Sequence, residues 1–292
     1  MNNTKPYAIT LDVGGSLLNK TGSWRTDRPV YLDRLPPCNN TCPAGENIQQ
    51  WLYHAENGEY KEAWLEIMKN NPFPAVMGRV CYHSCEDACN RVHLDDPVGI
   101  NSVERFLGDQ ALINQWKVEP GKSSGKKIMI VGAGMAGLAC AYHLRLFGHD
   151  VTIFESSSKS GGMVRYGIPK YRMPNEKLNA EIHRIQDMGV TIELNTKIDD
   201  VIATKEKYGF DAVFLSIGAQ NGNLIDIKSD QSIPSLSAIE ILRGIEDDIA
   251  TGLHGHVVVY GGGNTALDVA RSAIRMGAKS VKVVVRNSQD KM

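Results

Sequence analysis

Two glycine-rich segments, each placed directly after a short apolar strand, most constrain how this chain folds. The first runs from Gly132 to Gly137 as Gly-Ala-Gly-Met-Ala-Gly, and the second from Gly261 to Ala266 as Gly-Gly-Gly-Asn-Thr-Ala. Each opens a helix, so closely packed backbone N–H groups and a helix N-terminus can hold a pyrophosphate. Two matches in this strand-turn-helix context predict two dinucleotide-binding folds in one chain.

The residue that ends the following strand distinguishes the two predicted nucleotide sites. The strand 150–155 ends in Glu155, whose carboxylate can accept hydrogen bonds from ribose hydroxyls and would repel a 2′-phosphate, which favours FAD or NAD. The strand 281–286 ends in Arg286, whose guanidinium suits a 2′-phosphate and favours NADPH. A solvated strand-end arginine is the simpler alternative, and Asn287 stands where a second positive charge would strengthen the case, so NADH stays open.

Length and composition exclude several other classes of protein. The chain has 292 residues, a net charge of -1 and 42% hydrophobic residues, which describes a globular protein of two or three domains without a nucleic-acid partner. The N-terminus lacks the apolar core of a signal peptide, and the apolar stretch 128–142 is short and broken by glycine. We therefore expect a cytoplasmic protein with no membrane segment.

Five of the six cysteines fall between Cys38 and Cys89, ahead of both glycine-rich segments. In a reducing compartment this clustering indicates metal or cluster ligation in preference to disulfides. Thiolates suit both iron–sulfur sites and zinc, and His83 and His93 are available nearby, so both kinds of site stay open at this point.

Hydrophobic periodicity predicts helices around these cysteines. Apolar residues at helical spacing on both sides of Asn57-Gly58 predict a helical hairpin. A further helix that includes 100–107 places Glu104 on its inward side, where a carboxylate beside cysteines needs a partner. Three sulfurs recur at intervals of four and would share one face of a helical turn: Cys81, Cys85 and Cys89.

From its cysteines onward the chain resembles the small subunit of NADPH-dependent glutamate synthase and is similar to the electron-input half of dihydropyrimidine dehydrogenase. The resemblance covers residues 35–292 and rests on the order of six motifs: Cys-x3-Cys-Pro, Asn-Pro-Phe-Pro-Ala-Val-x-Gly-Arg-Val-Cys, Cys-Glu-x-x-Cys, Gly-x-Gly-x-x-Gly, Gly-Gly-Met-x-Arg-Tyr-Gly-Ile-Pro and Gly-Gly-Gly-Asn-Thr-Ala-x-Asp. It implies an α/β chain in which an N-terminal all-helical iron–sulfur domain precedes two Rossmann-like domains, the second truncated. The expected boundaries are a polar extension at 1–34, the helical domain at 35–121, the FAD domain at 126–222 and the NAD(P)H domain at 223–292.

The same resemblance implies which residues contact each nucleotide. Contacts with FAD fall on Gly132, Ala133, Gly134, Met135, Ala136, Gly137, Glu155, Gly162, Met163, Arg165, Arg172 and Ile198. Contacts with NAD(P)H fall on Gly262, Gly263, Asn264, Thr265 and Arg286. The chemistry of some of these residues agrees with the implied FAD contacts. The Gly161-Gly162 turn lets backbone approach a cofactor, and Arg165 and Arg172 offer cations near it. A surface position is the alternative for Arg172.

Carried over residue by residue, the resemblance implies one complete and one incomplete set of cluster ligands. The complete set for a [4Fe–4S] cluster consists of Cys42, Cys81, Cys85 and Glu104. The other set keeps only Cys38 and Cys89, because Val30 and Asp33 stand where the family pattern has two further cysteines. We expect one cluster, not two, and the flavin motifs favour iron–sulfur over zinc.

The implied activity is oxidation of NAD(P)H through FAD, with electrons passed through the cluster to a catalytic large subunit or another acceptor protein. No side chain is expected to act as acid, base or nucleophile, because hydride passes between stacked rings. A thioredoxin-reductase type would need a Cys-x-x-Cys pair, which the sequence lacks. Family members continue beyond Met292, so a truncated, non-catalytic cluster-binding or interaction protein is the alternative.

Overall fold

The computed structural model describes residues 35–220, 222, 235–249, 252–286 and 288. By its contacts, Pro37–Met292 forms one compact unit. Val30 and Asp33, which stand where the family pattern has two further cysteines, lie outside the described residues. Within the described part, no helix is both long and apolar enough to cross a membrane.

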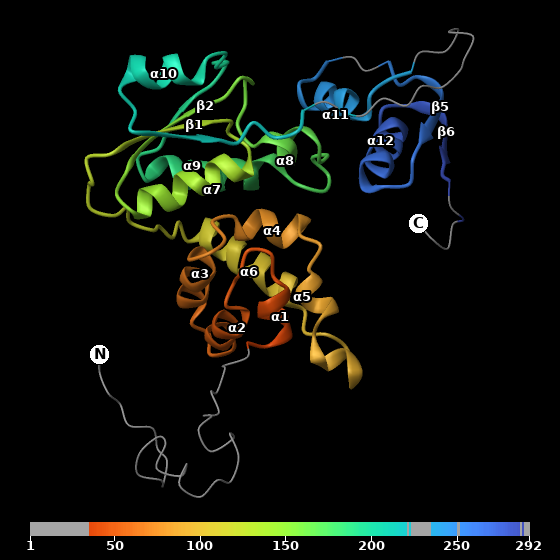
Figure 1. Ribbon diagram of the computed structural model, residues 1–292. Helices are drawn as coiled ribbons and strands as arrows, with labels where there is room; N and C mark the ends of the chain where they lie inside the picture. The colour runs from red at the N-terminus through yellow and green to blue at the C-terminus, as the bar shows by residue number, and fades with distance from the viewer. Residues whose placement is uncertain (1–34, 221, 223–234, 250–251, 287, 289–292) are drawn as a thin grey trace, which may run out of the picture. The chain divides into compact units, whose positions relative to one another are not determined.

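Helices form the first part of this unit (Figure 1). Their bounds are α1 Pro37–Thr41, α2 Ile48–Glu56, α3 Tyr60–Met68, α4 Pro74–Val80, α5 Ser84–Asp87, the 3-10 helix η3 Asn90–His93 and α6 Ile100–Ile113. The predicted hairpin of α2 and α3 is present, and Gly58 adopts a φ of 76° in the turn between them, which favours glycine. Apolar side chains of α2, α3 and α6 share one core: Ile48, Trp51, Ala63, Ile67, Ile100 and Leu107.

The expectation that Cys81, Cys85 and Cys89 share one helical face is wrong. Cys81 is extended at the end of α4, and His83 adopts a φ of 40° and a ψ of 44° in the left-handed region. The helix that carries Cys85 is therefore only α5, Ser84–Asp87, and Cys89 is extended again before η3. Because the backbone changes conformation between the three cysteines, their spacing of four does not place them on one face.

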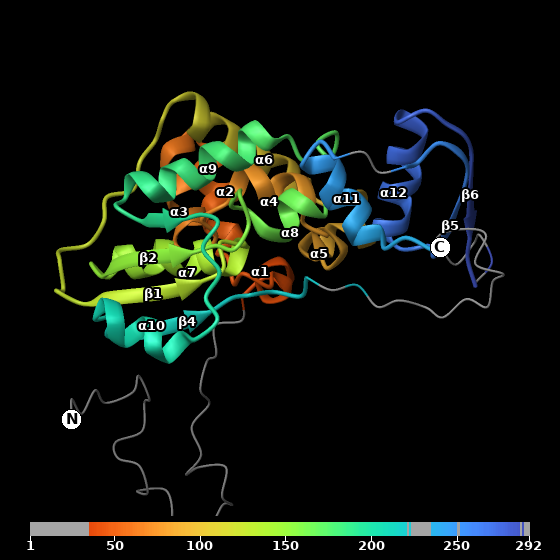
Figure 2. The same cartoon turned by 90° about the horizontal axis from the view of Figure 1, so that it is seen from above.

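A parallel four-stranded sheet carries the first glycine-rich segment. Its elements are β1 Lys127–Val131, α7 Met135–Leu146, β2 Asp150–Phe154, α8 Gly162–Tyr166, α9 Asn175–Asp187, β3 Thr191–Glu193, α10 Val201–Tyr208 and β4 Ala212–Leu215. The strand order is β3-β2-β1-β4 (Figure 2). In the register, Val131 lies opposite both Phe154 and Leu215. Figure 1 shows α7 and α9 on one face of the sheet and α10 on the other. This arrangement confirms the predicted Rossmann-like architecture for the first fold.

The second glycine-rich segment lies in a smaller parallel pair. Its described elements are α11 Ala238–Glu246, β5 Gly255–Tyr260, α12 Asn264–Arg275 and β6 Ala278–Val284. β5 and β6 pair in parallel, with Tyr260 opposite Val284, and α12 connects them. Apolar side chains from all these elements form one cluster that includes Ile241, Val259, Val269 and Ala273, with Val281 packed against it. The βαβ unit matches the predicted strand-turn-helix context of the second segment.

A buried carboxylate joins the helical part to the first nucleotide fold. Glu181 of α9 is fully buried, and its two oxygens accept hydrogen bonds from the backbone N–H groups of Ala75 at 2.9 Å and Val76 at 3.0 Å. These donors lie in the first turn of α4, where N–H groups have no partner within the helix. Arg184 lies 3.3 Å from the same carboxylate and donates to the carbonyl oxygen of Pro72 at 2.7 Å. A side chain of the nucleotide fold therefore caps α4.

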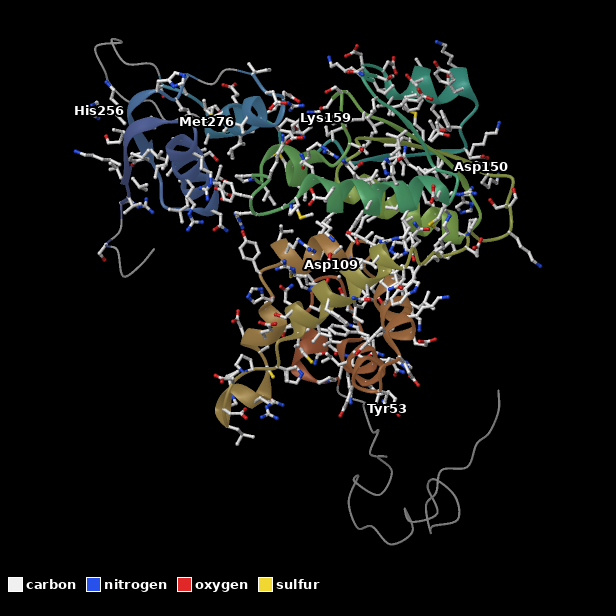
Figure 3. The ribbon with its side chains drawn as sticks, turned by 180° about the vertical axis from the view of Figure 1, so that it is seen from behind. Tyr53, Asp109, Asp150, Lys159, His256 and Met276 are labelled. Atoms are coloured by element: carbon white, nitrogen blue, oxygen red, sulfur yellow. The ribbon has the colours of Figure 1, made fainter. Side chains whose placement is uncertain are left out.

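Further polar contacts reinforce this junction. Asp109 of α6, labelled in Figure 3, lies 2.7 Å from Arg79 of α4 and 3.0 Å from Lys177 of α9. Burial works against the charge of Asp109, but Arg79 and Lys177 together lower the pKa of this carboxyl group. The hydroxyl of Tyr142, in α7, donates to the carbonyl oxygen of Met68 at 2.9 Å. Both helices on this face of the sheet thus bond to the helical part.

We expect Glu181→Gln to lower the free energy of unfolding by about 3 kcal/mol, because Arg184 stays buried without its carboxylate and one N–H of α4 loses its acceptor. Urea unfolding followed by tryptophan fluorescence measures this, since Arg184 lies over the ring of buried Trp64. The matched control is Glu176→Gln, an exposed position in the first turn of the same helix, which should change the free energy of unfolding by less than about 0.5 kcal/mol. Equal effects of the two substitutions would contradict the role given to Glu181.

Candidate functional site

The three glycines of the first segment have different structural roles. Gly132 adopts a φ of 104°, and a β-carbon there would lie 2.4 Å from the carbonyl oxygen of Ser216. A β-carbon on Gly137 would lie 2.0 Å from the carbonyl oxygen of Gly132, so α7 approaches β1 closely only without one. A β-carbon on Gly134 would have, among the described residues other than its chain neighbours, only the Cα of Gly162 within 4 Å, at 3.8 Å. The middle glycine therefore leaves room at the N-terminus of α7, where Met135 and Ala136 begin the helix, for a pyrophosphate to approach.

Glu155 holds the same loop from the end of β2. Its Oε2 accepts a hydrogen bond from the N–H of Ala133 at 2.7 Å, and its Oε1 accepts one from the N–H of Ser157 at 2.8 Å. The residue is buried. The carboxylate is thus placed beside the glycine-rich segment, as expected, and its contact with a ribose stays a prediction.

The Gly161-Gly162 turn brings a second backbone segment against the first. Gly161 adopts a φ of 117° and Gly162 a φ of 52°. A β-carbon on Gly162 would lie 2.7 Å from the Cα of Gly134, so the two backbones approach as closely as glycine permits. Met163 follows in α8. The turn therefore borders the open side of Gly134.

Three other predicted flavin contacts are engaged with protein groups. Arg165 is buried, and its guanidinium lies 3.7 Å from the carboxylate of Glu246 in α11. Arg172 donates to the carboxylate of Asp268 in α12 at 2.6 Å. Ile198 packs against a small apolar cluster on the sheet. Contacts of these residues with a flavin stay predictions, and for Arg172 such a contact would compete with Asp268.

The second segment has the same arrangement, except that Ala266 stands where the first segment has its last glycine, Gly137. Gly261 adopts a φ of 130°, and apart from Gly263 and its chain neighbours no atom of the described residues lies within 4 Å of where a β-carbon on Gly263 would be. Asn264, the first residue of α12, donates from Nδ2 to the hydroxyl of Tyr82 at 3.2 Å. The predicted NAD(P)H contacts lie in this turn or, for the last, in exposed chain just after β6: Gly262, Gly263, Asn264, Thr265 and Arg286.

Cys85 lies close enough to Cys81 and to Cys42 to interact electrostatically with each of them. Burial is the main cause that raises the pKa of Cys85 to about 12, and the neighbouring Cys81 and Cys42 contribute to it. Burial also raises the pKa of Cys81, and the charge of Glu104 adds to this effect. These pairwise influences link each member of the implied ligand set to at least one other member, and that the four bind one cluster stays a prediction.

Backbone N–H groups are directed at the same sulfurs. Burial raises the pKa of Cys42, and the N–H groups of residues 44–46 oppose that rise. The N–H of His83 lies 3.3 Å from the sulfur of Cys81. The backbone N–H of Glu86 donates to the sulfur of Cys85. Such hydrogen bonds favour the thiolate, which is the form that binds iron.

Two buried carboxylates lie beside these thiols, and the sequence pointed to only one of them. Glu104 is 6% exposed, as its inward position predicts, and Glu46 is 5% exposed. Burial raises the pKa of both, and the charge of Glu46 adds to the large rise at Glu104. Asn71 donates to both carboxylates. Glu46 was missed in the sequence because a single acid in a loop belongs to no hydrophobic periodicity. Its position four residues after Cys42 in the sequence was the available signal.

Cys38 and Cys89 interact electrostatically with each other. Burial raises the pKa of Cys38, and the charge of Cys89 adds to the rise. Over the described ranges, no three His, Cys, Asp or Glu side chains converge closely enough to hold a single metal ion.

Comparison with known proteins agrees with this geometry. Residues 126–290 match the family model described as pyridine nucleotide-disulphide oxidoreductase. The chain belongs to that oxidoreductase family. Residues 30–116 match a second model, described as dihydropyrimidine dehydrogenase domain II with a 4Fe-4S cluster. These matches confirm the resemblance inferred from the motifs and the order of a helical cluster domain before the dinucleotide folds of the oxidoreductase.

Three curated relatives show how far the similarity extends. The beta subunit of an NADPH-Fe(3+) oxidoreductase from Geobacter sulfurreducens is 38% identical over 90% of this chain. The beta subunit of an NADP(+)-dependent formate dehydrogenase from Moorella thermoacetica is 35% identical over 88%. The small chain of glutamate synthase [NADPH] from Bacillus subtilis is 35% identical over 82%. This oxidoreductase chain spans 40% of the length of the first two relatives and 51% of the third.

We expect Cys85 of the cluster-free oxidoreductase to alkylate slowly at neutral pH. With a pKa of about 12, about one Cys85 thiol in 10⁴ is ionised at pH 8, and only the thiolate reacts. The alkylation rate, followed by mass spectrometry, should therefore rise by about tenfold per pH unit up to pH 11.

The matched variant for this measurement is Glu86→Gln. Glu86 raises the pKa of Cys85, so its neutralisation should make Cys85 alkylate faster at pH 8. A rate that levels off near pH 9 in the unsubstituted chain would contradict the burial of this thiol.

Proposed function

We propose that this chain is the electron-input part of an NAD(P)H-oxidising flavoprotein that carries one [4Fe–4S] cluster and passes electrons to a partner. The observation that carries the proposal is the pair of open glycines, Gly134 and Gly263, each at the N-terminus of a helix that follows a parallel strand. Two such positions in one chain provide one site for the hydride donor and one for the acceptor. The domain boundaries proposed for these parts are 35–121, 126–222 and 223–292.

The residues around the first segment fit FAD. The backbone of Gly132–Gly137 would hold the pyrophosphate, the Gly161-Gly162 turn with Met163 would border it, and Glu155 would face the ribose. FAD bound there supplies acceptance of a hydride from NAD(P)H and release of single electrons. The chain contributes position and electrostatics, and the proposal gives no side chain the role of acid, base or nucleophile.

The residues around the second segment fit NAD(P)H. Gly262, Gly263, Asn264 and Thr265 would hold its pyrophosphate at the start of α12. Arg286, exposed beyond β6, would bind a 2′-phosphate, which makes NADPH the proposed donor. NADH is the alternative.

The thiols fit a cluster in the helical part. Three cysteines and one carboxylate form the proposed ligand set: Cys42, Cys81, Cys85 and Glu104. The N–H groups directed at the sulfurs and the burial of the carboxylate support this set. Cys38 and Cys89 alone offer half of a second set, so the proposal has one cluster.

The electron acceptor is proposed to be a separate polypeptide. Two of the relatives are named as beta subunits and one as a small chain. These names support a catalytic partner subunit or another acceptor protein for this chain, without specifying which.

We expect Gly134→Ala to abolish copurification of FAD while the fold stays intact, because the added methyl group fills open space that the pyrophosphate would occupy. Gly263→Ala should leave FAD bound and weaken NADPH binding by at least about tenfold, for the same reason at the second site. Flavin absorbance and NADPH titration measure the two effects, and each variant is the control for the other. If either variant loses neither nucleotide, the glycine assignments are wrong.

We expect Arg286→Ala to lower the ratio of kcat/KM for NADPH to that for NADH by about tenfold or more, because one charge-assisted contact is lost. Steady-state kinetics with a soluble artificial electron acceptor measures the ratio. An unchanged ratio would assign Arg286 to the solvated surface.

A further inference from the structure

Asn71 lies between the two buried carboxylates beside the thiols. Its Nδ2 donates to Oε1 of Glu46 and to Oε1 of Glu104, both at 2.9 Å. Asn71 itself is 6% exposed. The three side chains come from the loop after Cys42, the loop before α4 and the middle of α6, so the amide connects three separate parts of the helical domain.

The orientation of this amide is determined by the backbone. The N–H of Phe73 donates to Oδ1 of Asn71 at 2.9 Å. If the amide were turned over, its NH2 group would face that N–H, and its oxygen would face two carboxylate oxygens. Asn71 therefore presents both of its N–H hydrogens to the acids, one to each.

The two acids differ in what their second oxygen does. Oε2 of Glu46 accepts a hydrogen bond from Nε1 of buried Trp51 at 3.2 Å, so both oxygens of Glu46 are engaged. No donor among the described residues bonds Oε2 of Glu104. Both acids interact electrostatically with Cys81, and Glu46 also interacts with Cys42, so the thiols alone do not distinguish the two acids. Of the two acids, only Glu104 keeps an oxygen that no described donor bonds.

We propose that Asn71 is a positioning residue that presents Glu104, and not Glu46, as the non-thiolate ligand of the cluster. This role rests on the cluster of the proposed function. It goes beyond that function by naming the residue that determines which of the two buried acids binds the cluster. By holding Oε1 of Glu104, Asn71 restrains the carboxylate and leaves Oε2 as the oxygen that can bind iron. By holding Glu46 together with Trp51, it keeps the competing carboxylate occupied.

Electron paramagnetic resonance of the reconstituted, dithionite-reduced 292-residue chain, with iron counted per chain, tests this selection. We expect Glu104→Ala to change the g-values and lower the iron content from about four toward about three per chain, because one iron loses its protein ligand. Asn71→Ala should give the same altered signal. Glu46→Gln and the exposed neighbour Asn70→Ala should keep the parent signal and iron content.

The outcomes separate this inference from the proposed function. If the parent binds no cluster, both are overturned. If the parent binds a cluster and Glu104→Ala alters it, but Asn71→Ala keeps the parent signal, only the role of Asn71 is overturned. An altered signal in Glu46→Gln together with an unchanged one in Glu104→Ala would make Glu46 the ligand and also overturn it.

A second variant covers the case in which Asn71→Ala does not fold, as judged by circular dichroism and thermal unfolding. Asn71→Ser keeps a polar group but has one hydrogen to donate, so it cannot hold both acids. We expect it to give a mixture of the parent and altered signals. A pure parent signal in a folded Asn71→Ser protein would contradict the proposal.

Discussion

The contact between Glu181 and the first turn of α4 is the interaction on which the placement of the cysteine segment depends. The fully buried carboxylate accepts two backbone hydrogen bonds, and Arg184 beside it bonds to the carbonyl oxygen of Pro72. α4 leads directly into Cys81, so the segment that carries the thiols begins at a helix capped from the nucleotide fold. Because burial of these charges is costly without their partners, loss of any one member destabilises the junction.

The second nucleotide fold is attached in a different way. Glu246 of α11 is buried among cations of the first fold, with Lys170 at 3.4 Å and Lys159, labelled in Figure 3, at 3.6 Å. Arg172 pairs with Asp268 of α12 at 2.6 Å. These ion pairs join side chains, whereas Glu181 bonds to backbone. A substitution at Glu181 should therefore affect the thiols. A substitution at Glu246 or Asp268 should instead affect how the two nucleotide folds are held together.

The sequence predicted the parts of this molecule that follow from local periodicity and from glycine. Both strand-turn-helix units, the α2–α3 hairpin and the inward position of Glu104 are present, because each depends on residues close together in the chain. The shared helical face for Cys81, Cys85 and Cys89 was wrong, because the left-handed backbone at His83 interrupts the helix and no spacing rule reveals it. Glu46, Asn71 and Glu181 carry no pattern of their own, since their importance comes from partners distant in sequence. Arg165 and Arg172 were expected to be cations beside a flavin, and the structure pairs them with Glu246 and Asp268, which lie about 80 to 100 residues away.

The proposed electron path requires that one chain of this oxidoreductase family holds a flavin, a nicotinamide nucleotide and a cluster in electronic contact. The most direct test is an anaerobic visible absorption spectrum of the purified chain, with iron, sulfide, zinc and flavin quantified, recorded before and after addition of NADPH. The account predicts flavin and about four irons per chain, with both absorptions bleached by NADPH. Zinc or no metal in place of iron, together with the absence of flavin, would contradict it.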